Sequence, residues 1–193
     1  MPSQHTRRTA ASLFVAAGAS AIAAPAASAP PLPATPAGLP QDFDFEHGNW
    51  RTSLRRRLRP LSGSDTWAEY TGTTLVHPLL SGRANLVELD VSGPEGRIQG
   101  LSLRLFEVQR QRWTLNFSNA ASGTLAAAMV GGFGGSPRGL FYSAEDFNGR
   151  PILVRFVIES LNADRCRFEQ AFSADGGVTW EVNWVAVDTR RSY

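Results

Sequence analysis

Apolar and polar residues alternate along most of the chain after residue 48. At the start of this region, Trp50, Leu54 and Leu58 fall on one face of an extended strand, and arginines occupy much of the other face. A period of two is typical of β-strands with one buried face, and almost no stretch has the period of an amphipathic helix. We predict strands over 50–59, 66–76, 84–92, 98–108, 112–119, 139–147, 151–161, 165–173 and 178–189.

The connections between these strands are short and rich in turn-forming residues. The turn at 162–164 fixes the register of the two strands that it joins, with Glu159 opposite Arg167 and Ile158 opposite Phe168. The charged residues of this hairpin share one face, which we expect to face outward rather than to line the interior. Short connections favour an antiparallel meander, and closure removes its exposed edges. The predicted fold is therefore all-β, an antiparallel up-and-down barrel of about nine to ten strands.

Residues 119–138 break this pattern. The run 125–130 fits either a short strand or a single helical turn, and the Gly-Gly-Phe-Gly-Gly run 131–135 is expected to be a mobile hairpin tip or a lid at the barrel mouth. These glycines do not fit a phosphate-binding loop, because they have no associated lysine and no helix follows them. The sequence therefore argues against nucleotide binding.

The first 40 residues differ in composition from the rest. Arg7 and Arg8 precede an Ala-rich run that ends in a small-x-small cleavage signal, so residues 1–23 are predicted to be an export signal of the twin-arginine or the general secretory type. Residues 24–40 are a Pro/Ala-rich linker that we expect to be disordered or extended. The barrel domain then spans 41–193. We expect a protein exported to the periplasm or the exterior of a bacterium, with no transmembrane segment.

Charge and cysteine content narrow the choice of partners. All 19 basic residues are arginines, and without Arg7 and Arg8 the remaining 17 match the 17 acidic residues. A domain without net charge lacks the positive surface of a nucleic-acid-binding protein. Cys166 is the single cysteine, so it forms no intramolecular disulfide, and we expect a half-buried structural thiol.

Few residues offer catalytic or metal chemistry. Beyond the predicted signal the histidines are His47 and His77, and the chain has no Gly-x-Ser-x-Gly elbow, no cysteine pair and no His-x-His. We predict no metal, no cofactor and no assigned catalytic residue. An enzyme that pairs one of these histidines with a carboxylate such as Glu69 or Glu88 stays as an alternative.

The run Ser-Ala-Asp-Gly-Gly-Val-Thr-Trp at 173–180 resembles the Asp-box of sialidases and other glycosidase propellers. In those enzymes the box is structural and recurs around the propeller, whereas here it occurs once in a chain too short for one. Asp175 and Gly177 are therefore expected to shape a tight hairpin, with Trp180 packed beneath it.

Four sequence features together resemble a little-characterised bacterial family of calycin-like barrel proteins. They are Phe-Asp-Phe-x-x-Gly-x-Trp at 43–50, the hairpin at 106–113, Asn-Gly-Arg at 148–150, and the run from 168 to 180. The resemblance covers residues 42–191 and implies a lipocalin-like barrel with an internal cavity and no assigned activity.

Lipocalins add a structural expectation to this resemblance. They stack an arginine beyond the last strand on the indole of the Gly-x-Trp motif, a role that Arg190 or Arg191 matches here against Trp50, with Gly48 before it. The related haem-binding nitrobindins use a histidine on a late strand as axial ligand. This chain has no histidine after His77, so we expect no haem.

The leading functional hypothesis is a secreted barrel that holds a small, mostly apolar ligand. The residues expected at its wall are Trp67, Trp113, Phe117, Trp180, Trp184 and His77, and binding is expected to depend on the aromatic residues rather than on a histidine. One alternative is a ligand-free structural or interaction barrel of the cell envelope, and another is a barrel hydrolase or isomerase. A cavity of ~300 Å³ or more would favour binding. The oligomeric state is left open.

Overall fold

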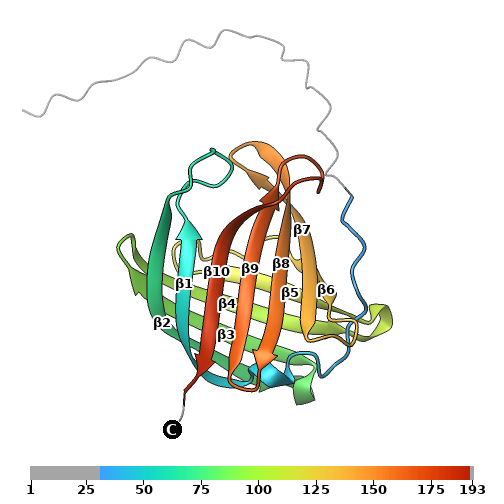
Figure 1. The fold of residues 1–193 in the computed structure, drawn as a ribbon. Coiled ribbons are helices and arrows are strands. Elements are labelled where there is room, and N and C mark those ends of the chain that lie inside the picture. Colours follow the sequence, from blue (N-terminus) through green and yellow to red (C-terminus); the bar gives the residue numbers. More distant parts are fainter. Residues whose placement is uncertain (1–30, 192–193) are drawn as a thin grey trace, which may run out of the picture.

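The computed structural model describes residues 31–191, which form a closed barrel of ten antiparallel strands (Figure 1). The strands are β1 (Gly48–Arg57), β2 (Trp67–Leu79), β3 (Ala84–Gly93), β4 (Gly96–Glu107), β5 (Arg112–Asn119), β6 (Met129–Gly132), β7 (Arg138–Phe147), β8 (Arg150–Asn162), β9 (Arg165–Ser173) and β10 (Glu181–Arg190). Three short 3-10 helices complete it: η1 (Asp44–Glu46), η2 (Leu80–Gly82) and η3 (Val108–Arg110). None of the helices among these residues has the length and hydropathy that crossing a membrane requires.

Every strand pairs with its neighbours in sequence, and β1 pairs with β10 to close the barrel. The predicted all-β antiparallel fold is therefore confirmed. The predicted register of the β8–β9 hairpin is confirmed as well, because Glu159 pairs with Arg167 and Ile158 with Phe168. Its charged face points outward: Arg155 lies 3.7 Å from Glu169, and both side chains are on the outer surface of the barrel.

The Gly-rich segment corrects one expectation. Met129–Gly132 is a short strand, β6, that pairs with β5 on one side and β7 on the other, so Gly131 and Gly132 are not part of a hairpin tip or lid. The absence of a side chain is required here, since a Cβ on Gly131 would lie 1.9 Å from the Leu140 carbonyl oxygen. Only Gly134 and Gly135, both with positive φ, form the turn that follows.

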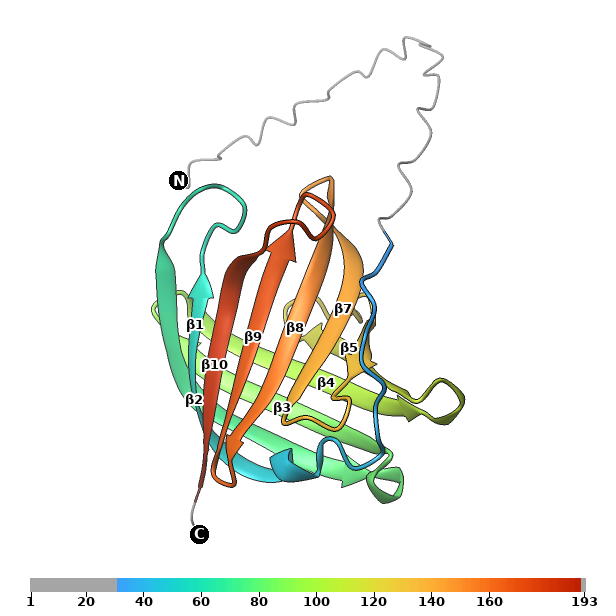
Figure 2. The same ribbon diagram turned by 45° about the vertical axis from the view of Figure 1, so that its right-hand side comes forward.

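One end of the barrel is closed by the chain that precedes β1. Figure 2 shows this segment descending beside β7 and turning under the barrel through η1. Phe43 packs there against Trp113, Phe133 and Phe141, with ring centroids 4.8–6.0 Å apart. Trp50, the first inward side chain of β1, is 1% exposed and donates a hydrogen bond from Nε1 to the Glu46 carbonyl.

The expected contact between Trp50 and a terminal arginine is confirmed. The Arg190 guanidinium carbon lies 4.2 Å from the centroid of the Trp50 ring, and the guanidinium also donates to the carbonyls of Phe45 and His47. Arg191 is exposed and takes part only through its backbone N–H, which donates to Asn49. A Cβ on Gly48 (φ +117°) would lie 3.2 Å from Arg190 Nη1, so glycine keeps the room that this guanidinium needs.

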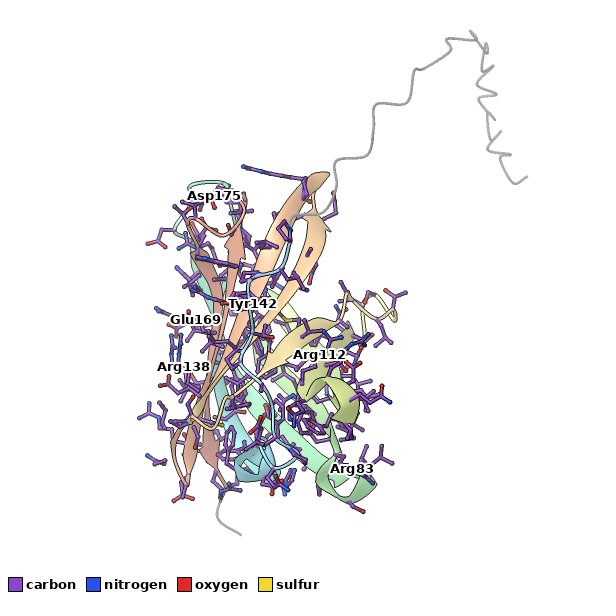
Figure 3. The ribbon with its side chains drawn as sticks, turned by 90° about the vertical axis from the view of Figure 1, so that its right-hand side faces the viewer. Arg83, Arg112, Arg138, Tyr142, Glu169 and Asp175 are labelled. Carbon is purple, nitrogen blue, oxygen red and sulfur yellow. The ribbon has the colours of Figure 1, made fainter. Side chains whose placement is uncertain are left out.

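The hairpin between β9 and β10 is built as its Asp-box-like sequence predicts. The Thr179 hydroxyl and backbone N–H both donate to the Asp175 carboxylate, and these bonds lower the pKa of Asp175 to about 2. The Gly177 N–H donates to the Ser173 hydroxyl. Figure 3 shows Asp175 at the opposite end of the barrel from Arg83, which follows η2 at the closed end. The hairpin therefore stands at the open end.

Part of the expected linker lies within the described residues. Residues 31–40 are extended, but the last of them pack on the barrel: Gly38 N–H donates to the Gln111 carbonyl, Gly134 N–H donates to Ala37, and the Trp113 indole donates to the Leu39 carbonyl. No apolar period marks these residues, because their contacts with the barrel use backbone groups. The predicted export signal at 1–23 lies outside the described residues.

We expect removal of residues 1–40 to destabilise the domain, although removal of residues 1–30 leaves those contacts intact. The longer deletion removes the acceptor of the Trp113 indole N–H and opens this fully buried ring to water, and the lost apolar burial costs about 1.5–3 kcal/mol. The melting temperature should fall by at least about 5 °C relative to the 1–30 deletion. Equal melting curves for the two deletions would show that the packed segment contributes nothing.

Candidate functional site

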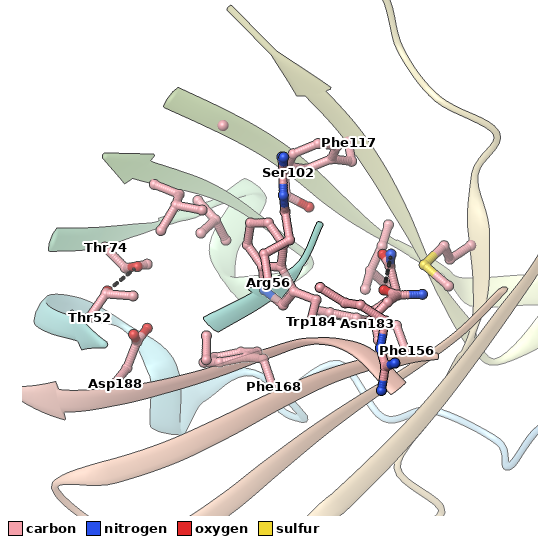
Figure 4. A pocket seen from close by; sticks show the side chains of 18 of the residues that line it. Thr52, Arg56, Thr74, Ser102, Phe117, Phe156, Phe168, Asn183, Trp184 and Asp188 are labelled. Atoms are coloured by element: carbon pink, nitrogen blue, oxygen red, sulfur yellow. Dashed lines mark hydrogen bonds between the residues drawn. The ribbon is translucent and has the colours of Figure 1, made fainter. Parts of the chain in front are cut away.

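The barrel encloses a cavity of about 500 Å³ that extends from the closed end to the open end. Figure 4 shows Thr52, Thr74 and Asp188 at one end of this cavity and Phe156 and Asn183 at the other. The side chains come from inward positions of the strands, every second residue, which is why distant parts of the sequence meet here.

Apolar side chains line the middle of the cavity. They are Val87 and Leu89 of β3, Leu115 and Phe117 of β5, Met129 of β6, Phe147 of β7, Phe156 of β8, Phe168 and Phe172 of β9, and Trp184 and Ala186 of β10. Large aromatic rings at alternate positions leave space between them instead of filling the interior. This wall suits an apolar body of limited size.

A β-bulge places polar groups near the open end. The β9–β10 register shifts between Val182 and Trp184, so Asn183 and Trp184, although consecutive, both face the cavity. The Gln170 side-chain amide donates to Asn183 Oδ1 at 3.0 Å, whereas Asn183 Nδ2 is buried without a partner among the described residues. Arg56 of β1 also lines this region.

A buried ion pair lies at the closed end of the cavity. Arg104 of β4 and Glu46 of η1 are 3% and 0% exposed, and both terminal nitrogens of the guanidinium donate to the carboxylate, one at 3.1 Å. The Arg104 guanidinium also lies over the Phe43 ring, 4.5 Å from its centroid. The pair therefore links η1 to β4, and its two opposite charges give it no net charge.

Asp188 lies beside this pair. Burial raises the pKa of Asp188 to about 7, the Thr52 hydroxyl opposes that shift, and the charge of Glu46 adds to it. Thr52 and Thr74 hydrogen-bond each other through their hydroxyls at 2.7 Å. The floor of the cavity thus combines a neutralised ion pair, two hydroxyls and one carboxyl group.

Cys166 is packed at the same end as a structural residue. It is 0% exposed, against the half-buried state that its sequence position predicts, and it stands opposite Asp188 in the β9–β10 ladder. Burial raises the pKa of its thiol, and the charges of Glu46 and Asp188 raise it further. A thiol kept protonated in this way is a poor nucleophile.

Two of the six residues expected at the wall line the cavity, Phe117 and Trp184. Trp113 faces inward but lies below the cavity, between Phe43 and Phe106, because the chain before β1 covers it. Its role at the wall is therefore corrected to one in closing the barrel.

The other three lie on the outer face. Trp67 pairs with Arg57 in the β1–β2 ladder, and the guanidinium carbons of Arg55 and Arg57 lie 5.0 and 4.9 Å from the centroid of its ring. Trp180 lies over Tyr142 and Arg155 outside β7 and β8. His77 is an exposed, outward residue of β2. These three positions are corrected: a period of two predicts the two faces but does not say which one is inside.

The residues named for the enzyme alternative do not meet in the cavity. Glu69 and Glu88 are exposed on the outer face, and no histidine is among the residues that line the cavity. Residues 31–191 contain no group of three or more His, Cys, Asp or Glu side chains arranged to hold a metal ion. The alternation does not predict the polar residues that face the cavity: the leucines on either side of Arg104 would assign it to the outer face, yet it is the arginine that is buried.

Among the comparisons with known proteins, solved structures bear on the fold. No family model matches the chain, and no curated protein matches its sequence. The S-type phycobiliprotein lyase of Guillardia theta is similar in structure, with a TM-score of 0.54 and 11% identity over 78% of this chain and 91% of that chain. A redesigned β-barrel bound to DFHBI matches with a TM-score of 0.43 and 10% identity, over 76% of this chain and 99% of the other. The lyase likeness shows a shared lipocalin-like barrel fold.

Proposed function

We propose that this protein binds a small, mostly apolar molecule inside its barrel and does so outside the cytoplasm of a bacterial cell. The observation that carries the proposal is the cavity of about 500 Å³ with an aromatic wall. That volume is typical of small-molecule sites, and a purely structural barrel would fill its interior with side chains. Burial of apolar ligand surface at ~25 cal/mol per Å² supports micromolar affinity after the cost of association.

The wall aromatic Trp184 provides the first test. Replacing Trp184 by alanine removes contact area from the cavity, and we expect a neutral, environment-sensitive apolar dye to bind about tenfold more weakly, a change of ~1.4 kcal/mol. Trp67→Ala removes the same side chain from the outer face and should bind like wild type. Dye fluorescence titrations measure both. Equal losses in the two variants would contradict binding inside the barrel.

Filling the cavity is the complementary test. Ser102 lines it, whereas Ser53 is an exposed residue of the outer face of β1. Ser102→Trp should abolish dye binding and Ser53→Trp should leave it unchanged. His47→Ala and His77→Ala should bind like wild type, since neither histidine lines the cavity. Loss of binding in a histidine variant alone would favour the enzyme alternative.

The cellular compartment has its own test. Residues 1–40 fused to a reporter that is active only after export should deliver it to the periplasm if residues 1–23 are a signal. Replacing Arg7 and Arg8 by lysine then separates the two export routes, because only the twin-arginine route requires the arginine pair. A reporter retained in the cytoplasm would refute the export part of the proposal.

A further inference from the structure

The Asp188 carboxyl faces the cavity without a charged partner. It is 1% exposed, and its Oδ1 has no hydrogen-bond partner among residues 31–191. The nearby cations are already engaged: Arg104 pairs with Glu46, and Arg190 donates to backbone carbonyls and stacks on Trp50. The hydroxyls of Thr52 and Thr74 hydrogen-bond the carboxyl group, but no cation balances its charge. A buried carboxylate with a free oxygen and no cation is costly, so native proteins rarely keep one without a function.

The groups around Asp188 are two hydroxyls, a thiol and an ion pair. Thr52 comes from β1 and Thr74 from β2, Cys166 stands opposite on β9, and the Glu46–Arg104 pair approaches from η1 and β4. The pair is neutral as a unit and the thiol is protonated. Once Asp188 ionises, this end of the cavity therefore carries one uncompensated negative charge.

We propose that this closed end is a site for a protonated amine, so that the cavity takes an amphipathic ligand with an amine head and an apolar body. The inference rests on the proposed function and adds the chemistry of the head group. The ammonium would meet the Asp188 carboxylate, and the Thr52 and Thr74 hydroxyls would accept its remaining N–H groups. The body lies along the aromatic wall towards Arg56, four residues or about 13 Å of strand from Thr52.

Arg56 would support a different head group, a carboxylate. It lines the cavity near the open end, and no hydrogen bond or ion pair of its guanidinium is found within residues 31–191. A ligand with a carboxylate head would use Arg56 and Asn183 Nδ2 instead. Asp188 is the stronger candidate because it is fully buried, whereas Arg56 is half-buried and can be hydrated.

The experiment compares three ligands that share one chain, decylamine, 1-decanol and decanoic acid, as competitors of a bound neutral apolar dye. At pH 8.5 decylamine should displace the dye at a concentration at least tenfold lower than decanol. At pH 5.5 this preference should fall at least threefold, because Asp188, with a pKa of about 7, is then protonated while the alkylammonium stays charged. This comparison needs no variant.

Asp188→Asn is the direct test and keeps the shape of the side chain. At pH 8.5 it should remove the preference for decylamine while decanol competes as in wild type. Asp90→Asn, an exposed residue on the outer face of β3, is the matched control and should keep the preference. The proposal is overturned if decylamine is not preferred, if Asp188→Asn retains the preference, or if decanoic acid competes best. If the dye itself does not bind, the proposed function fails with it.

Discussion

Replacing Arg104 by leucine is expected to lower the free energy of unfolding by about 3–5 kcal/mol. The change leaves the Glu46 carboxylate fully buried without its partner, and breaking one side of a buried ion pair has a cost of this order. The melting temperature should fall by about 10 °C or more for a domain of this size. Thermal and chemical unfolding of the variant measure the loss.

Two further variants separate charge from packing. Glu46→Leu combined with Arg104→Leu removes both charges and should recover most of the lost stability, because apolar replacements of buried pairs are often close to neutral. Arg97 lies in β4, as Arg104 does, but on the outer face, where it forms an exposed ion pair with Asp90 of β3. Arg97→Leu breaks this pair and should leave the melting temperature nearly unchanged. A double variant as unstable as Arg104→Leu would show that packing of these side chains dominates.

Replacing Trp50 by alanine is expected to cost about 3–5 kcal/mol as well, for a different reason. The indole is 1% exposed, its Nε1 donates to Glu46, and Arg190 covers its face. Truncation opens a void at the closed end, and large-to-small changes of aromatic core residues fall in this range.

Arg190 and Trp67 supply the comparisons for Trp50. Arg190→Met keeps an apolar cover on the ring but loses the bonds to Phe45 and His47, so a loss smaller than that of Trp50→Ala is expected. Trp67→Ala removes an outer-face indole and should cost least of the three. Denaturant midpoints of the three variants test this order, and a Trp67→Ala variant less stable than Trp50→Ala would reverse it.

The fold can be predicted from the local pattern, because inward and outward residues alternate along the strands of a barrel. In β1, inward Trp50 and Leu54 alternate with outward Arg51 and Arg55, so period and polarity agree over most of the strand and it is assigned correctly. The β8–β9 hairpin is equally predictable, since its turn fixes the register. The pattern leaves short β6 ambiguous because two of its four residues are glycines: Gly131 fits against the β7 backbone, and Gly132 fits against the backbone of the segment before β1.

The cavity lining is harder to predict, because one strand turns its leucines outward and its polar and small residues inward. In β4, Gly100, Ser102 and Arg104 face the interior, while Leu101 and Leu105 are exposed on the outside. An apolar residue at an alternate position therefore does not identify the inner face of such a strand. The bulge at Asn183 adds a local change of phase that the sequence pattern does not show.

The pairing of β1 with β10 has a consequence for how the chain folds. Trp50 meets Arg190 across nearly the whole described sequence, whereas every other ladder joins neighbouring strands. Such a contact of high sequence separation forms late, after the entropy of closing a long loop has been overcome. Until β10 joins, β1 keeps an unpaired edge that can recruit another chain. A chain truncated within β10 would therefore be prone to aggregation rather than simply less stable.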